Sequence, residues 1–78
     1  MSDAEILEGI RSVAAAHLGY EGPLEASMRL AEDLLLDSMK LLTLAIEIEN
    51  HFRVRLPDEI AAEIATVADL VDAIRSAA

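Results

Sequence analysis

The chain has 78 residues and a formal net charge of −9, from 15 acidic and 6 basic residues. A surface of this charge repels nucleic-acid backbones and anionic lipids, so nucleic acid is excluded as a partner and basic proteins are favoured. The sequence has no cysteine, which excludes disulfides and cysteine-based metal sites, and no stretch approaches the roughly 20 apolar residues of a membrane span.

The length predicts a single domain over residues 1–78, and the composition predicts that its core is helical. Apolar residues make up 54% of the chain, but there is one Phe, one Tyr and no Trp. Aliphatic side chains must therefore form the core. The N-terminal segment MSDAEILEG is acidic and lacks the basic start and apolar run of a signal peptide, so we expect a cytoplasmic protein.

The first predicted element is a helix from Ser2 to about His17. Ser2 and Glu5 have the spacing of a capping box, in which each side chain pairs with the other residue's backbone N–H. Apolar residues then recur on one helical face: Ile6, Ile10, Val13 and Ala14. Gly19 is the predicted stop, because glycine takes the left-handed conformation at a helix end without a steric penalty.

Residues 19–37 are predicted to form an ordered loop. Gly19, Gly22 and Pro23 interrupt the pattern at its start, and Asp37-Ser38 suits a helix entrance better than a helix interior. Long connections without secondary structure are uncommon in compact domains, so this one must pack apolar side chains to be stable. The candidates are Leu24, Met28, Leu30 and Leu34.

The second helix is predicted over residues 38–52, with two apolar stripes. One stripe has the spacing of a core face: Leu41, Leu44, Ala45, Ile48 and Phe52. A second stripe consists of Met39, Leu42 and Ile46, which gives this helix more apolar surface than one core-facing side requires. The second stripe is either covered by the long loop, the commoner arrangement, or offered to partner proteins.

Two further helices are predicted after residue 56. Pro57 suits a helix entrance and begins a short helix of about two turns. Thr66 and Asp69 have the spacing of a cap, and helical apolar spacing follows, which predicts the last helix. The expected fold is therefore all-α: a four-helix bundle with a long loop between helices one and two and a short third helix.

The pair Asp37-Ser38 interrupts a strongly apolar segment, LLLDSMKLL. Taken alone, such a pair before an apolar helix is most often a helix cap. Its context is more specific. The segment AEDLLLDSMKLLTLAIEIENHF, followed by RVRLPDE and TVADLVDAI, resembles the acyl carrier protein family of phosphopantetheine-bearing carriers over essentially the whole chain.

The resemblance implies that Ser38 carries phosphopantetheine through a phosphodiester, installed from coenzyme A by a phosphopantetheinyl transferase. It implies that Asp37 helps to present the site to that enzyme, a role compatible with capping. Acyl groups are commonly activated as thioesters, and a chain without cysteine could bind one only through the thiol of such an arm. The resemblance further implies a monomer that serves loading and processing enzymes in fatty acid or polyketide-type biosynthesis.

The sequence also departs from the family pattern. Leu35 stands where most members have glycine, which predicts a different local turn before Ser38. Lys40 and Thr43 replace positions that are often acidic in fatty-acid carriers, so basic partners lose part of an electrostatic contact. The predicted partner face consists of Met39, Lys40, Leu42, Ile46 and Glu47. The segments LLDS and AIEIEN also resemble D-alanyl and other aminoacyl or peptidyl carriers.

Two other functions compete with the carrier hypothesis. Ser38, His17 or His51 and an aspartate could be combined into a catalytic triad, but a helical core of this size offers no obvious substrate pocket or oxyanion hole. We therefore expect no intrinsic catalysis and no metal site. The other alternative is a non-carrying helical adaptor, in which Ser38 is only part of a cap and the second stripe is a binding surface.

Overall fold

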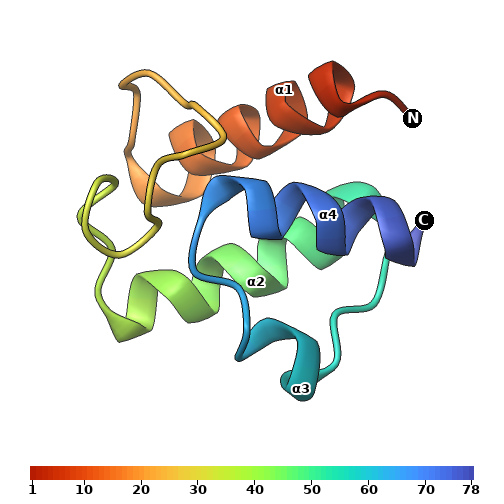
Figure 1. Ribbon diagram of the computed structural model, residues 1–78. Coiled ribbons are helices and arrows are strands. Elements are labelled where there is room, and N and C mark those ends of the chain that lie inside the picture. Colours follow the sequence, from red (N-terminus) through yellow and green to blue (C-terminus); the bar gives the residue numbers. More distant parts are fainter.

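The computed structural model describes all 78 residues and contains helices without strands. The elements are α1 (Asp3–Val13), a π-helical turn η1 (Ala14–Leu18), α2 (Ser38–Phe52), α3 (Asp58–Ala61) and α4 (Val67–Ala77). Figure 1 shows α1, α2 and α4 packed together, with α3 at the edge of the bundle and a long loop between α1 and α2. The predicted all-α class with four helices is confirmed. No helix of the structure is both long enough and apolar enough to span a bilayer.

Helix α1 begins with the predicted capping box. The Ser2 hydroxyl accepts a hydrogen bond from Glu5 N at 3.2 Å, and Glu5 Oε1 accepts one from Ser2 N at 2.9 Å. The Ser2 backbone N–H favours the ionised carboxylate and so lowers the pKa of Glu5. At the other end, η1 extends the helical segment to Leu18, and Gly19 terminates it with φ 69°. The predicted extent of the first helix is thus confirmed.

Glycine 9 lies in the middle of α1, where glycine normally weakens a helix. The reason is the close approach of α2. A Cβ atom at Gly9 would lie 2.4 Å from Cζ of Phe52 and 3.2 Å from Nε2 of His51. The missing side chain therefore lets the C-terminal end of α2 pack directly on α1.

The core is built from aliphatic side chains, as the composition predicts. Its buried members come from α1, the long loop, α2, the segment before α3, and α4: Ile6, Ile10, Val13, Leu30, Leu34, Leu36, Leu44, Ile48, Leu56, Val67, Leu70, Val71 and Ile74. Of the stripe on α2 that we predicted to be core, Leu44 and Ile48 are fully buried, while Leu41 and Phe52 are partly buried against this cluster. The orientation of α2 is therefore the one that the sequence predicts.

The loop over residues 19–37 is ordered and packed, as predicted. Leu30 and Leu34 are buried, and Leu24 and Met28 pack against the core from the surface. Backbone hydrogen bonds tie the loop to the segment that precedes and begins α4. Leu30 N donates to Ala65 O at 3.0 Å, Val67 N to Met28 O at 2.9 Å, and Ala68 N to Ala26 O at 2.9 Å.

Helix α3 is shorter than predicted. It covers Asp58–Ala61, about one turn, where the sequence predicts about two. The hydrogen bonds that follow are tighter turns, from Glu63 N to Ile60 O and from Ile64 N to Ala61 O. The chain leaves the helix because Ile64 must pack against the core while Thr66 adopts an extended backbone to cap α4.

Helix α4 begins at the predicted cap and closes the bundle against α1. The Asp69 carboxylate accepts hydrogen bonds from the backbone N–H groups of Ala65 and Thr66, and these bonds lower the pKa of Asp69. Near the other end, Arg75 Nη1 lies 2.6 Å from Asp3 Oδ1. Figure 1 accordingly places both termini at one end of the molecule.

Candidate functional site

The predicted attachment residue Ser38 is the first residue of α2. The cap itself is made by Asp37, which has an extended backbone and whose Oδ1 accepts a hydrogen bond from Lys40 N at 2.9 Å. The Asp37 carbonyl also accepts the bond from Leu41 N at 2.9 Å. Capping therefore does not need the Ser38 hydroxyl, and Ser38 is exposed to solvent. Asp37 alone therefore caps α2, and the Ser38 hydroxyl that follows takes no part in the cap.

The environment of Ser38 fits a tethered phosphodiester. The first N–H groups of a helix have no partner within the helix and lie at the positive end of its dipole, so they stabilise a nearby anion. No acidic residue occurs in the first turn of α2, and Lys40 lies exposed within it. A phosphodiester at this hydroxyl would face backbone donors and a cation, with the Asp37 carboxylate turned toward the backbone of Lys40.

Leu35 has a left-handed backbone conformation, with φ 58°. This conformation costs a leucine about 1–2 kcal/mol relative to the right-handed region, but costs glycine nothing comparable. The residues on either side explain why the chain adopts it, because Leu34 and Leu36 are both buried in the core. The sequence predicted a different local turn from the replacement of glycine. That comparison with other members stays a prediction; in this chain the backbone at Leu35 has the left-handed conformation that glycine favours.

A small polar network stabilises the turn that precedes Leu35. The Asp33 carboxylate accepts a hydrogen bond from Arg29 N at 2.7 Å, and Arg29 Nη1 lies 3.1 Å from Glu32 Oε1. Leu36 N donates to Ala31 O at 3.1 Å. The acidic pair Glu32-Asp33 therefore has a local structural role in this chain.

The second apolar stripe of α2 is exposed rather than covered. Met39, Leu42 and Ile46 have exposed fractions of 72%, 57% and 47%. The loop covers the opposite side of the helix with its buried leucines, so the alternative of coverage by the loop is wrong. The Thr43 hydroxyl donates to the Met39 carbonyl at 3.0 Å and adds no charge to this face. The exposed stripe begins directly after Ser38.

Glu47, the last residue of the predicted partner face, contacts another part of the chain. Its Oε1 lies 3.4 Å from Nε2 of His17 in η1, and its side chain is partly exposed, at 29%. His51 stacks edge-on against Phe52 near the end of α2. Since an α-helix rises 1.5 Å per residue, His51 lies roughly 20 Å from Ser38 along α2. The two histidines and Ser38 are thus not brought together as a triad.

A cavity of about 300 Å³ lies beside α2, between that helix, α3 and the core. Ten of its eleven lining residues are apolar. Leu41, Leu44 and Ala45 of the predicted core stripe line it, together with Ala61 and Ala62, which no sequence pattern had indicated. The small side chains of these two alanines leave space between α3 and α2.

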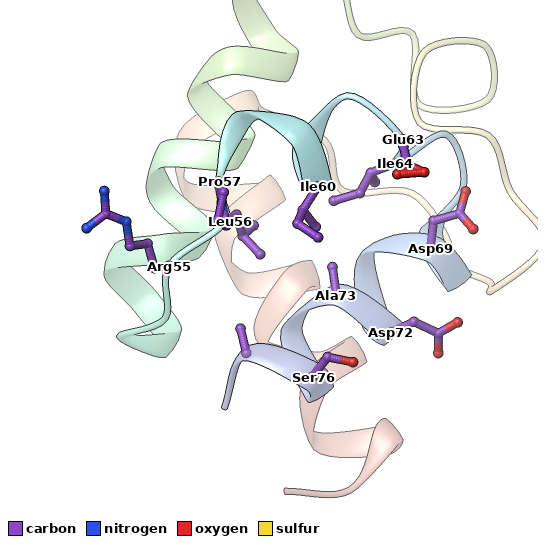
Figure 2. A pocket seen from close by; sticks show the side chains of 11 residues that line it. Arg55, Leu56, Pro57, Ile60, Glu63, Ile64, Asp69, Asp72, Ala73 and Ser76 are labelled. Atoms are coloured by element: carbon purple, nitrogen blue, oxygen red, sulfur yellow. The ribbon is translucent and has the colours of Figure 1, made fainter.

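The largest cavity, of about 590 Å³, lies elsewhere, between the segment around α3 and helix α4. Figure 2 shows Ile60 and Ile64 pointing toward α4, with the carboxylates of Asp69 and Asp72 at one edge. None of the residues predicted as site residues lines it. Both carboxylates already have partners: Asp69 caps α4, and Asp72 pairs with Arg75.

Comparison with known proteins identifies the family of the chain. The family described as "Phosphopantetheine attachment site" matches residues 8–74, which defines the chain as a carrier of that covalently bound group. The acyl carrier protein of Rubrobacter xylanophilus is 43% identical over 75 residues, covering 92% of this chain and 90% of the relative. That of Akkermansia muciniphila is 38% identical over 72 residues, covering 91% and 90%. The chain belongs to the acyl carrier protein family.

Solved structures show the same fold. A structure described as an acyl carrier protein from Mycobacterium tuberculosis superposes with a TM-score of 0.84 at 28% identity, covering 91% of this chain and 96% of that one. An acyl carrier protein from Thermotoga maritima superposes with a TM-score of 0.88 at 23% identity, covering 99% and 91%. The second likeness concerns the fold alone.

Proposed function

We propose that Ser38 is the attachment residue for phosphopantetheine and that the chain delivers acyl groups, held as thioesters on that arm, to separate enzymes. One observation carries this assignment: Ser38 is exposed at the first position of α2 while Asp37 makes the cap. The hydroxyl is therefore accessible to a modifying enzyme without disruption of the helix. The arm supplies the thiol that this cysteine-free chain lacks.

The residues around Ser38 support a passive role in the attachment reaction. A serine hydroxyl needs a base within hydrogen-bond reach to act as a nucleophile. His51 lies at the far end of α2, His17 lies in η1 beside Glu47, and the Asp37 carboxylate already accepts a bond from Lys40 N. The phosphopantetheinyl transferase must therefore supply the base. Once attached, the phosphodiester is stabilised by the N-terminal dipole of α2.

We further propose that the exposed stripe of α2, with Lys40 at its edge, is the surface that biosynthetic enzymes contact. Met39, Leu42 and Ile46 are apolar and exposed directly after Ser38, so an enzyme that reaches the arm covers them. Glu47 contributes through its pairing with His17, which fixes η1 against α2. Fatty acid or polyketide-type biosynthesis in the cytoplasm is the pathway class proposed, with the chain as a monomer.

The cavity beside α2 suits the apolar part of a cargo. Its lining is almost entirely aliphatic, so it can bury methylene groups, each of which contributes about 0.8 kcal/mol. An octanoyl group that places about three methylenes there should raise the free energy of unfolding by about 2 kcal/mol over the arm-bearing protein. Urea denaturation of the two forms measures this difference.

The matched variants are Ala61→Phe, which fills the cavity, and Ala4→Phe on the exposed surface of α1. The gain in stability on acylation should disappear in Ala61→Phe and persist in Ala4→Phe. An octanoyl form that unfolds at the same urea concentration as the arm-bearing form would show that the cargo stays outside the bundle.

The carrier function is tested by the appearance of a thiol. The purified chain has no cysteine and should not react with a thiol reagent. After incubation with coenzyme A and a phosphopantetheinyl transferase, followed by removal of small molecules, it should contain one reactive thiol per chain. A chain that gains no thiol would instead be the helical adaptor.

A further inference from the structure

Leu35 is the most exposed large apolar residue of the chain, with 80% of its surface accessible. Its orientation is imposed by its neighbours, since Leu34 and Leu36 are 3% and 5% exposed and turn into the core. With φ 58°, the backbone directs the intervening side chain away from the bundle. Leu35 therefore has no packing role within the fold.

The conformation of Leu35 also makes leucine an unfavourable choice for folding. A left-handed backbone favours glycine, and a fully solvated position favours a polar side chain. Leucine meets neither preference, and no contact within the chain compensates. Unfavourable backbone conformations of this kind gather at functional sites, where another requirement determines the residue.

The surroundings of Leu35 identify that requirement. The chain has six exposed large hydrophobic residues, and four of them lie within residues 35–46, on both sides of Ser38 along the sequence: Leu35, Met39, Leu42 and Ile46. An enzyme that brings coenzyme A to the Ser38 hydroxyl must cover the surface next to it. Leu35 is three residues before Ser38, on the loop side, whereas Met39 follows it on the helix side.

The carboxylates before Ser38 each have a local partner within the chain. The first turn of α2 contains no acidic residue, and the Asp37 carboxylate is engaged by the backbone N–H of Lys40. The Asp33 carboxylate accepts a bond from the backbone N–H of Arg29, and Glu32 pairs with the Arg29 guanidinium. These carboxylates are exposed and keep their charge, so a basic enzyme surface can also meet them, but beside the hydroxyl an apolar surface finds exposed leucine and methionine.

We propose that Leu35 is a specificity-determining residue that inserts into an apolar socket of the phosphopantetheinyl transferase and positions Ser38 for modification. This inference rests on the proposed function, because it takes Ser38 as the attachment residue. The contact is apolar, so it is independent of ionic strength, and it is made on the loop side of the site rather than along α2.

The test is the rate of arm transfer by a transferase that modifies the wild-type chain, with coenzyme A as the donor. Leu35→Ala should lower kcat/KM about tenfold through KM, since the buried leucine side chain is lost. Leu35→Met should keep most of the wild-type rate. The ratio between wild type and Leu35→Ala should stay the same at low and high salt, because screening weakens charge contacts only.

Leu35→Gly separates recognition from loop structure. Glycine removes the side chain and relieves the backbone, so Leu35→Gly should resist urea better than Leu35→Ala while its kcat/KM is equally low. If Leu35→Gly is instead modified faster than Leu35→Ala, in the same order as their resistance to urea, the structure of the loop controls arm transfer. That result would overturn the inference.

Two other outcomes would also overturn it. If Leu35→Ala is modified as fast as wild type while Ser38→Ala is not modified, the attachment site stands and the role of Leu35 fails. If sedimentation shows a wild-type dimer that Leu35→Ala converts to a monomer, the leucine binds a second copy of the chain instead. A wild type that is not modified by any transferase contradicts the proposed function itself.

Discussion

Replacing Ser38 with alanine should leave the chain folded and without any phosphopantetheine. Asp37 caps α2 through Lys40 N, and the exposed Ser38 hydroxyl lies outside that cap, so the change should alter the free energy of unfolding by less than about 0.5 kcal/mol. Arm transfer, in contrast, has no acceptor in the variant. Intact mass after incubation with coenzyme A and a transferase should increase by one arm in the wild type and not at all in Ser38→Ala.

The matched control is Ser12→Ala, which removes another exposed hydroxyl, near the C-terminal end of α1. It should gain one arm at the wild-type rate. Circular dichroism and urea denaturation of both variants establish that the fold is retained. An arm found on Ser38→Ala would assign the attachment to another residue and remove the role of the α2 entrance.

The features that the sequence predicts well are those governed by local chemistry. The caps at Ser2, Asp37 and Thr66 follow from the hydrogen bonds that a short polar side chain makes to its own backbone three residues on. The burial of Leu44 and Ile48 follows from helical spacing. The position of Ser38 at a helix entrance was therefore predictable from the sequence.

The features that the sequence did not predict depend on packing between segments that are distant along the chain. Leu35 adopts a glycine-type conformation because its neighbours Leu34 and Leu36 are both buried in the core. The identity of residue 35 alone does not reveal this. Helix α3 stops after one turn because Ile64 must reach the core before Thr66 caps α4. The cavity beside α2 depends on two alanines of this segment lying opposite α2.

The exposure of the second stripe of α2 also depends on how distant segments pack. The loop could have covered either side of α2, since both are apolar, and the sequence favours coverage. In the structure the loop leucines instead enter the core formed with α1 and α4, which leaves Met39, Leu42 and Ile46 in solvent. The exposed stripe next to Ser38 has no packing role in the fold, which supports the proposal that partner enzymes contact it.

Substitutions of Ile46 and Ile48, which are two positions apart in α2, should distinguish effects on folding from effects on partner contact. Ile48 is fully buried in the core, whereas Ile46 is 47% exposed on the second stripe. Ile48→Ala should lower the free energy of unfolding by about 3 kcal/mol, because it removes buried methylene groups and leaves a cavity. Ile46→Ala should lower it by less than about 1 kcal/mol. Urea denaturation monitored by circular dichroism measures both values.

The KM of the loading enzyme should be affected in the opposite order, more by Ile46→Ala than by Ile48→Ala. Ile46→Ala should raise the KM of the enzyme that loads an acyl group onto the arm by about threefold to tenfold, because an apolar contact of less than 2 kcal/mol is lost. Ile48→Ala, measured well below its unfolding transition, should be loaded with the wild-type KM, since the side chain never reaches the surface. Equal KM values for Ile46→Ala and wild type would place the loading enzyme on another face of the bundle, whereas a stability loss in Ile46→Ala as large as in Ile48→Ala would make both stripes part of the core.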